Sequence, residues 1–125
     1  GSPVTSAAAL ATLQTVQDEK LVANAAKMGM HLISGLRTLQ QRFPFIGDIR
    51  GRGLMIGVEI TVEGAPDKHL TSEIQKICIA RNLLLLTCGT SGNVIRWIPP
   101  LIVTAEQIDH ALATFEGALN GVTKE

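Results

Sequence analysis

The sequence predicts one α/β (α+β) domain in which amphipathic helices cover a mixed sheet of about four strands. Long stripes of apolar residues at steps of three and four alternate with short apolar runs bounded by glycine and proline. The chain has 125 residues, a usual size for one domain. Its core must be aliphatic, because 46% of the residues are hydrophobic and only 3% are aromatic.

Two helices are expected before the first strand. Ser2 is placed to cap a helix that starts at Pro3, and the alanine-rich segment 4–16 continues this helix. A second helix is predicted from Leu21 to Phe43, because its apolar residues form one continuous stripe and a proline follows it. A kink or short break is expected between them, near residues 18–20.

Two strand-like runs follow, one on each side of Gly51-Arg52-Gly53. The second run, Leu54 to Ile60, is mostly apolar and contains Gly57, where another backbone can approach closely. The Gly-Arg-Gly sequence suggests a phosphate-binding loop. However, it lacks the spacing of a nucleotide fingerprint and no helix follows it. A structural turn or bulge is the better interpretation.

The second half of the sheet is predicted from another pair of runs. A polar turn leads into a helix over Lys68 to Asn82, with Asp67 as its cap. Leu83 to Leu86 is an unbroken apolar run, typical of a strand covered on both faces. Residues 89–93 form a turn, and Val94 to Ile98 is the last predicted strand.

The chain is expected to end in a helix. Pro99 and Pro100 stop the last strand, because proline has no N–H to donate to a sheet. Thr104 and Gln107 have the spacing of a capping box, and the helix that they open is expected to end near Gly121. The predicted order is helix, helix, strand, strand, helix, strand, strand, helix.

Arg96 is the candidate functional residue, because it lies inside a predicted apolar strand. Side chains alternate along a strand, so Arg96 shares a face with the aliphatic residues Val94 and Ile98. A charge in such a place must be paired or must reach an aqueous cleft. Three interpretations remain open at this point: an internal ion pair, a position on the rim of the sheet, or a site for an external anion. The guanidinium fork fits a carboxylate.

The charge pattern excludes several classes of partner. Acidic and basic residues balance at 11 each and are scattered along the chain, so no surface for nucleic acid or anionic membrane is predicted. No apolar run approaches the roughly 18 residues of a membrane span. No Walker loop, dinucleotide fingerprint or nucleophile elbow is present in the sequence.

Cysteine and histidine usage gives no metal or redox site. Cys78 and Cys88 are too few for a disulfide framework, so free thiols and a cytoplasmic location are expected. His31, His69 and His110 fall on three separate elements, without the spacing of metal ligands. The acidic residues are isolated in the sequence, so no pair of catalytic carboxylates is predicted.

Three stretches of the sequence resemble the class III (omega) pyridoxal-phosphate-dependent aminotransferases. The first, from Gly1, is Gly-Ser-Pro-Val-Thr-Ser-Ala-Ala-Ala-Leu, where the family usually has asparagine at the position of Ser2. The second is Ile-Gly-Asp-Ile-Arg-Gly-Arg-Gly-Leu-Met-Ile-Gly-Val-Glu, from Ile46. The third, Leu-Leu-Thr-Cys-Gly-Thr-Ser-Gly-Asn-Val-Ile-Arg-Trp-Ile-Pro-Pro-Leu from Leu85, is most similar to the 4-aminobutyrate aminotransferase branch.

The resemblance implies the fold of type I pyridoxal-phosphate enzymes. Residues 1–43 would be a helical lead-in, and residues 44–125 the C-terminal small domain. The implied reaction is a ping-pong transfer of an amino group from an amine donor, such as 4-aminobutyrate, to a 2-oxo acid, commonly 2-oxoglutarate. The family's substrate-carboxylate arginine falls on Arg96. A homodimer or higher oligomer is implied.

The resemblance also implies what this chain lacks. The family's Schiff-base lysine and the carboxylate that partners the pyridine nitrogen lie upstream of the Gly-Ser-Pro stretch, so no catalytic or cofactor-binding residue is assigned here. The chain is therefore expected to be a fragment of a larger enzyme and inactive in isolation. The alternative is a free-standing, non-catalytic module that binds carboxylates or assembles with other copies. A large exposed apolar surface would favour the fragment.

Overall fold

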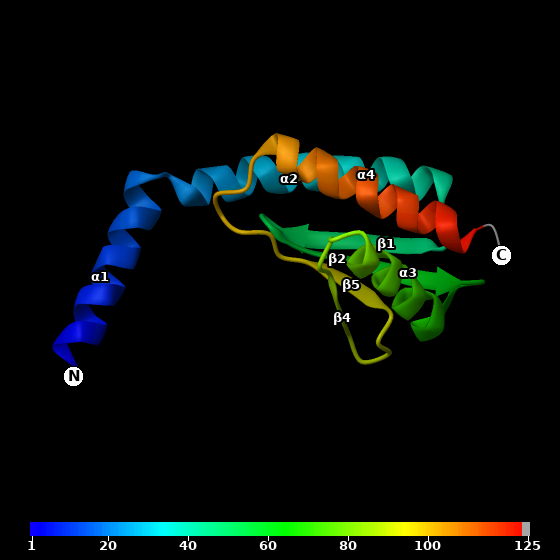
Figure 1. The fold of residues 1–125 in the computed structure, drawn as a ribbon, viewed down its shortest axis with the longest axis horizontal. Coiled ribbons are helices and arrows are strands. Elements are labelled where there is room, and N and C mark those ends of the chain that lie inside the picture. Colours follow the sequence, from blue (N-terminus) through cyan, green and yellow to red (C-terminus); the bar gives the residue numbers. More distant parts are fainter. Residues whose placement is uncertain (124–125) are drawn as a thin grey trace.

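The computed structural model, which describes residues 1–123, has three helices packed on one face of an antiparallel sheet. A fourth helix, α1, projects away from them (Figure 1). The elements, in chain order, are α1 (Pro3–Asp18), α2 (Leu21–Arg42), β1 (Ile46–Arg52), β2 (Met55–Val62), β3 (Ala65–Pro66), α3 (Lys68–Ala80), β4 (Leu86–Cys88), β5 (Val94–Trp97) and α4 (Ala105–Val122). The predicted order of helices and strands is confirmed, with β3 as an addition.

The strands lie in the order β1-β2-β5-β4, and the two-residue strand β3 pairs with β2. Every pair among the described strands is antiparallel, whereas the sequence predicted mixed directions. The difference follows from the connections. Short turns join β1 to β2 and β4 to β5, and a short turn forms a hairpin, because parallel neighbours need a long crossover.

The core lies between the sheet and helices α2, α3 and α4. Figure 1 shows α2 and α4 side by side above the strands. The predicted apolar stripes of these helices face the sheet. The fully buried side chains include Leu32, Leu36, Ile56, Val58, Ile60, Ile74, Ile95, Phe115 and Leu119. Most of this core is aliphatic, as the composition predicted.

Helix α1 contributes no buried residue to the core. The predicted break between the first two helices is confirmed at Glu19 and Lys20, where Lys20 takes a left-handed conformation with φ of 51°. That conformation is unfavourable for a residue with a side chain and redirects the chain. Helix α1 therefore presents Leu10 and Leu13 to solvent.

The predicted strand over Leu83 to Leu86 is wrong in position. Strand β4 starts only at Leu86, and Leu84 is 77% exposed. The side chain of Gln75, on α3, donates a hydrogen bond of 2.8 Å to the backbone oxygen of Leu85. This contact ties the segment to α3 before it joins the sheet. Four consecutive leucines therefore do not indicate a strand buried on both faces here.

Two of the three predicted helix caps are confirmed. Ser2 stands at the N-cap position of α1, but its side chain makes no capping hydrogen bond. A carboxylate oxygen of Asp67 accepts a hydrogen bond of 2.8 Å from the backbone N–H of Leu70 at the start of α3. Thr104 and Gln107 form both bonds of the capping box at the start of α4. Such caps satisfy N–H groups that have no partner within the helix. No helix within residues 1–123 is long and apolar enough to cross a membrane.

Cys78 makes the stability of the core dependent on pH. Burial raises the pKa of its thiol to about 11 from an ordinary value of 9.0, and the charge of Arg81 offsets part of the shift. Between these two values the unfolded chain loses the thiol proton while the folded chain keeps it. The free energy of unfolding should therefore fall as the pH rises from 9.0 to about 11.

Urea denaturation across this range checks the prediction, with Cys78→Ala as the control. The variant should lose the part of the pH dependence that belongs to this thiol. An equal slope in both proteins would assign the effect to other groups.

Candidate functional site

Arg96 lies in β5, between β2 and β4, and pairs with Gly57 on one side and Leu86 on the other. Its sequence neighbours Ile95 and Trp97 point into the core and are buried. By the alternation of a strand, Arg96 points to the opposite face, and it is exposed. The sequence prediction that Arg96 and Ile95 lie on different faces is therefore confirmed.

The face of the sheet that carries Arg96 is called the open face here, because most of its side chains are exposed. By strand register it comprises Asp48, Arg50 and Arg52 on β1, Met55, Gly57 and Glu59 on β2, Leu86 and Cys88 on β4, and Val94 and Arg96 on β5. The apolar members Met55 and Leu86 are at least half exposed. Arg96 is therefore a cation among apolar side chains at the middle of this face.

The side chain of Arg96 makes no ion pair or hydrogen bond with any residue among 1–123. Of the three interpretations that the sequence left open, the internal ion pair is thus not found in the described part of the chain. The guanidinium presents its donors to the outside of the sheet. Its geometry permits a bidentate contact with an external carboxylate.

A second cation of the open face is paired, and the sequence did not predict its partners. Arg50 donates hydrogen bonds of 2.7 Å to Asp48 and 2.6 Å to Glu59. These bonds, with Asp48 as the larger cause, raise the pKa of Arg50 above its ordinary value. Asp48 and Glu59 are therefore not isolated, although they are eleven positions apart in the sequence. The hairpin register, which places Asp48 opposite Glu59, is the signal that would have found the cluster.

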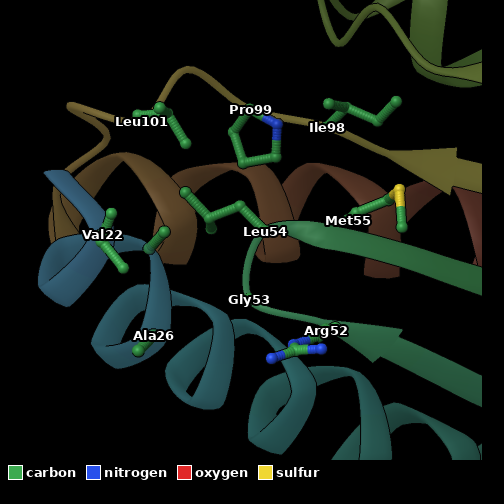
Figure 2. A pocket seen from close by; sticks show the side chains of 10 residues that line it. Val22, Ala26, Arg52, Gly53, Leu54, Met55, Ile98, Pro99 and Leu101 are labelled. Atoms are coloured by element: carbon green, nitrogen blue, oxygen red, sulfur yellow. The ribbon is translucent and has the colours of Figure 1, made fainter. Parts of the chain in front are cut away.

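An apolar hollow of about 460 Å³ lies next to the open face (Figure 2). The first turns of α2, the turn between β1 and β2, and the segment after β5 surround it. Gly53, in that turn, has φ of 56°. The prediction that Gly51-Arg52-Gly53 forms the turn is only partly right, because Gly51 and Arg52 end β1 and pair with Ile56 and Met55, and the chain reverses at Gly53 and Leu54. Arg96 is not among the lining residues, so the hollow is a neighbour of the arginine rather than its pocket.

The residues present do not form a cofactor or metal site by themselves. Among residues 1–123, no group of three or more histidine, cysteine or acidic side chains could hold a metal ion. None of the open-face positions is a lysine, so none could link pyridoxal phosphate beside Arg96. The open face therefore offers an exposed cation, Arg96, without a lysine beside it.

Comparison with known proteins identifies the family. The model of the class-III aminotransferases matches residues 1–119. The chain belongs to this family. Within it, the chain is 44% identical to the alanine/serine racemase of Pyrococcus horikoshii over 94% of its length. It is 41% identical to the 5-aminovalerate aminotransferase of Pseudomonas putida over 93%, and 40% identical to the 4-aminobutyrate aminotransferase of Mycobacterium leprae over 90%.

Solved structures of the class III fold superpose on most of the chain. A phospholyase from Arthrobacter, in complex with phosphoethanolamine, matches 94% of the chain with a TM-score of 0.91 and 33% identity, and the match covers 29% of that protein. A lysine aminotransferase from M. tuberculosis matches 89% of the chain with a TM-score of 0.80 and 30% identity, over 24% of its own length. The chain spans 25% to 28% of the three curated relatives.

Proposed function

We propose that this chain is the C-terminal, substrate-carboxylate-binding part of a pyridoxal-phosphate-dependent aminotransferase. The parent enzyme would move an amino group from an ω-amino acid, such as 4-aminobutyrate, to 2-oxoglutarate. Arg96 carries the proposal, because an exposed arginine without an internal partner lies on the open face of a class III chain. A guanidinium in that position can grip the carboxylate of a bound amino acid or 2-oxo acid.

In this proposal Arg96 binds and orients the substrate. Two parallel N–H···O bonds fix both the position and the plane of a carboxylate, and a point charge cannot do this. Leu86 is opposite Arg96 on β4 and Val94 shares its face of β5, so apolar side chains flank the guanidinium. Pyridoxal phosphate, when bound by the rest of the enzyme, supplies the electron sink for breaking bonds at the amino carbon.

Exposed apolar surface supports the fragment rather than a free-standing module. Large apolar side chains are exposed on α1, on the open face and after β5, among them Leu10, Leu13, Met55, Ile98 and Ile102. Such surface is typical of a region that packs against other protein. The match to only about a quarter of each curated relative points the same way.

The domain organisation, assembly and cellular location of the parent enzyme are also part of the proposal. Residues 1–43 would lead from the rest of the enzyme into the small domain of residues 44–125. Helix α2, which belongs to this lead-in, packs on β1 and α4 of the small domain. A homodimer or higher homo-oligomer, and a cytoplasmic enzyme, are proposed from the family resemblance and from the free cysteines Cys78 and Cys88.

The choice of amino donor is supported by relatives rather than by residues of this chain. Two of the relatives are aminotransferases for 4-aminobutyrate and 5-aminovalerate. A racemase and a phospholyase also match this chain, so its fold does not by itself select the reaction. We therefore propose a linear ω-amino acid as donor, with 4-aminobutyrate first.

Activity assays of the chain and of its full-length parent test this proposal. With pyridoxal phosphate, 4-aminobutyrate and 2-oxoglutarate, the full-length enzyme should form glutamate with ping-pong kinetics. The isolated 125-residue chain should form none, because it offers no lysine on the open face. Turnover by the isolated chain would contradict the proposal. A full-length protein that transfers no amino group between any ω-amino acid and a 2-oxo acid would also contradict it.

A further inference from the structure

We propose that Asn24 is a positioning residue for substrate binding, because its side-chain amide fixes the segment that follows β5, the strand that carries Arg96. This inference rests on the proposed function of Arg96. Asn24 itself need not contact the substrate. It would act through the place that Arg96 takes in the sheet.

The side-chain amide of Asn24 binds two carbonyl groups of one connection. Its Nδ2 donates a hydrogen bond of 2.6 Å to the backbone oxygen of Leu101 and one of 3.2 Å to the backbone oxygen of Val103. Both acceptors lie between β5 and α4, and Figure 1 shows this connection passing the beginning of α2. Because both partners are acceptors, the contact needs the two N–H donors of a primary amide. A carboxylate in the same place could donate neither bond.

Few other contacts hold this connection. Among residues 1–123, Asn24 is the only side chain with a hydrogen bond to residues 98–103. Within the connection, the backbone N–H of Val103 donates to the backbone oxygen of Pro100 at 3.0 Å. Val103 is buried, whereas the three other large aliphatic side chains of the segment are 44% to 65% exposed. Loss of the Asn24 amide would therefore release the connection between β5 and Val103.

Helix α2 gives Asn24 a fixed base. The backbone N–H of Asn24 donates to the backbone oxygen of Lys20 at 3.1 Å, so Asn24 lies in the first turn of the helix. Leu21 and Met28 of the same helix are buried. The helix packs on α4, β1 and β2. Asn24 therefore ties the connection to an element whose own place is set by packing against other parts of the domain.

Two prolines pass a displacement of the connection on to β5. Pro99 and Pro100 lie between the end of β5 and Leu101. A proline ring fixes φ near −65°, and the residue before a proline is restricted as well. This stretch therefore has little rotational freedom with which to absorb movement. Arg96 is the penultimate residue of β5, so it lies at the end of the strand that such movement reaches first.

A substrate that uses the guanidinium fork of Arg96 should be sensitive to this movement. Two parallel N–H···O bonds require the guanidinium to lie in the plane of the carboxylate, so a small displacement weakens both bonds. A substrate without a carboxylate makes no such contact. Substitution of Asn24 should therefore weaken the binding of carboxylate substrates selectively.

Kinetics of the full-length enzyme test this inference with two acceptors, 2-oxoglutarate and an aldehyde that has no carboxylate. Asn24→Asp keeps nearly the same shape but has no N–H donor. It should raise the KM for 2-oxoglutarate about three- to tenfold, as expected for a misplacement smaller than the roughly 1 Å that costs a hundredfold. It should leave the KM for the aldehyde unchanged.

Gln40→Glu is the matched control. Gln40 also lies on α2, and its amide donates to two backbone oxygens, that of Ile46 at 3.3 Å and that of Gly47 at 3.2 Å. These oxygens belong to β1, which β2 separates from β5. Gln40→Glu removes two bonds of the same kind, so urea denaturation should show a comparable loss of stability in both variants. The KM for 2-oxoglutarate should rise only in Asn24→Asp.

The double variant Asn24→Asp/Arg96→Met shows whether Asn24 acts through Arg96. Once Arg96 has been replaced, Asn24→Asp should change the KM for 2-oxoglutarate by less than about twofold, because both substitutions remove the same contact. An equal rise in the presence and in the absence of Arg96 would mean that Asn24 acts elsewhere, and would overturn the inference.

Three other results would also overturn it: an unchanged KM in Asn24→Asp, an equal rise with both acceptors, and an equal rise in Gln40→Glu. If Asn24→Asp does not fold, Asn24→Ala makes the same comparisons. Arg96→Met separates the two proposals. Should Arg96→Met leave the KM for 2-oxoglutarate unchanged, the proposed function fails. Should Arg96→Met raise it while the Asn24 variants do not, only the inference about Asn24 fails.

Discussion

Arg96→Lys in the full-length enzyme is expected to raise the KM for 2-oxoglutarate by roughly 30-fold to several hundred-fold. Loss of a paired contact to a charged group costs about 2–4 kcal/mol. Lysine keeps the charge but is a single ammonium on a flexible stem, so it cannot make the two parallel bonds of a guanidinium. The half-reaction of each substrate should be measured separately. The loss of affinity in Arg96→Lys should appear only with substrates that bind through a carboxylate.

Arg37→Lys is the control for this measurement. Arg37 is an exposed arginine on α2 outside the open face, and its replacement should leave both half-reactions unchanged. An aldehyde acceptor without a carboxylate should react equally well with Arg96→Lys and with the unsubstituted enzyme. Unchanged kinetics of Arg96→Lys with 2-oxoglutarate would remove Arg96 from the site.

The position of Arg96 could be predicted from sequence because it depends on local rules. The alternation of β5 places Ile95 and Trp97 in the core, so Arg96 must point the other way. The pairing of Arg50 with Asp48 and Glu59, and the lack of an ion-pair partner for Arg96 among residues 1–123, could not be predicted, because both depend on which side chains meet across the strands. That information requires the pairing of β1 with β2 and of β2 with β5, which sequence patterns do not determine residue by residue.

The strand predicted over Leu83 to Leu86 was wrong for the same reason, because its position also depends on tertiary contacts. An apolar run of four residues fits a buried strand, but it also fits a connection that packs one leucine and leaves its neighbours exposed. In this chain Leu85 is buried and Leu84 is exposed, because Gln75 of α3 binds the segment from the side. Only the tertiary contact distinguishes the two structures.

Gly29→Ala is expected to destabilise the fold strongly. A Cβ atom at Gly29 would lie 2.1 Å from the backbone oxygen of Gly53 and 2.5 Å from its carbonyl carbon. These atoms belong to the turn between β1 and β2, and backbone cannot rotate away as a side chain can. The substitution must therefore separate α2 from the turn. Overpacking of this kind costs about 1–3 kcal/mol or more, which exceeds the roughly 1 kcal/mol that alanine gains over glycine in a helix.

Gly35→Ala on the same helix is the matched control. A Cβ atom at Gly35 would lie 2.3 Å from a terminal methyl group of Leu112, a flexible side chain that can change rotamer. Urea denaturation of the two variants should therefore show a much smaller loss for Gly35→Ala than for Gly29→Ala. Equal losses would mean that the turn moves as easily as a leucine side chain.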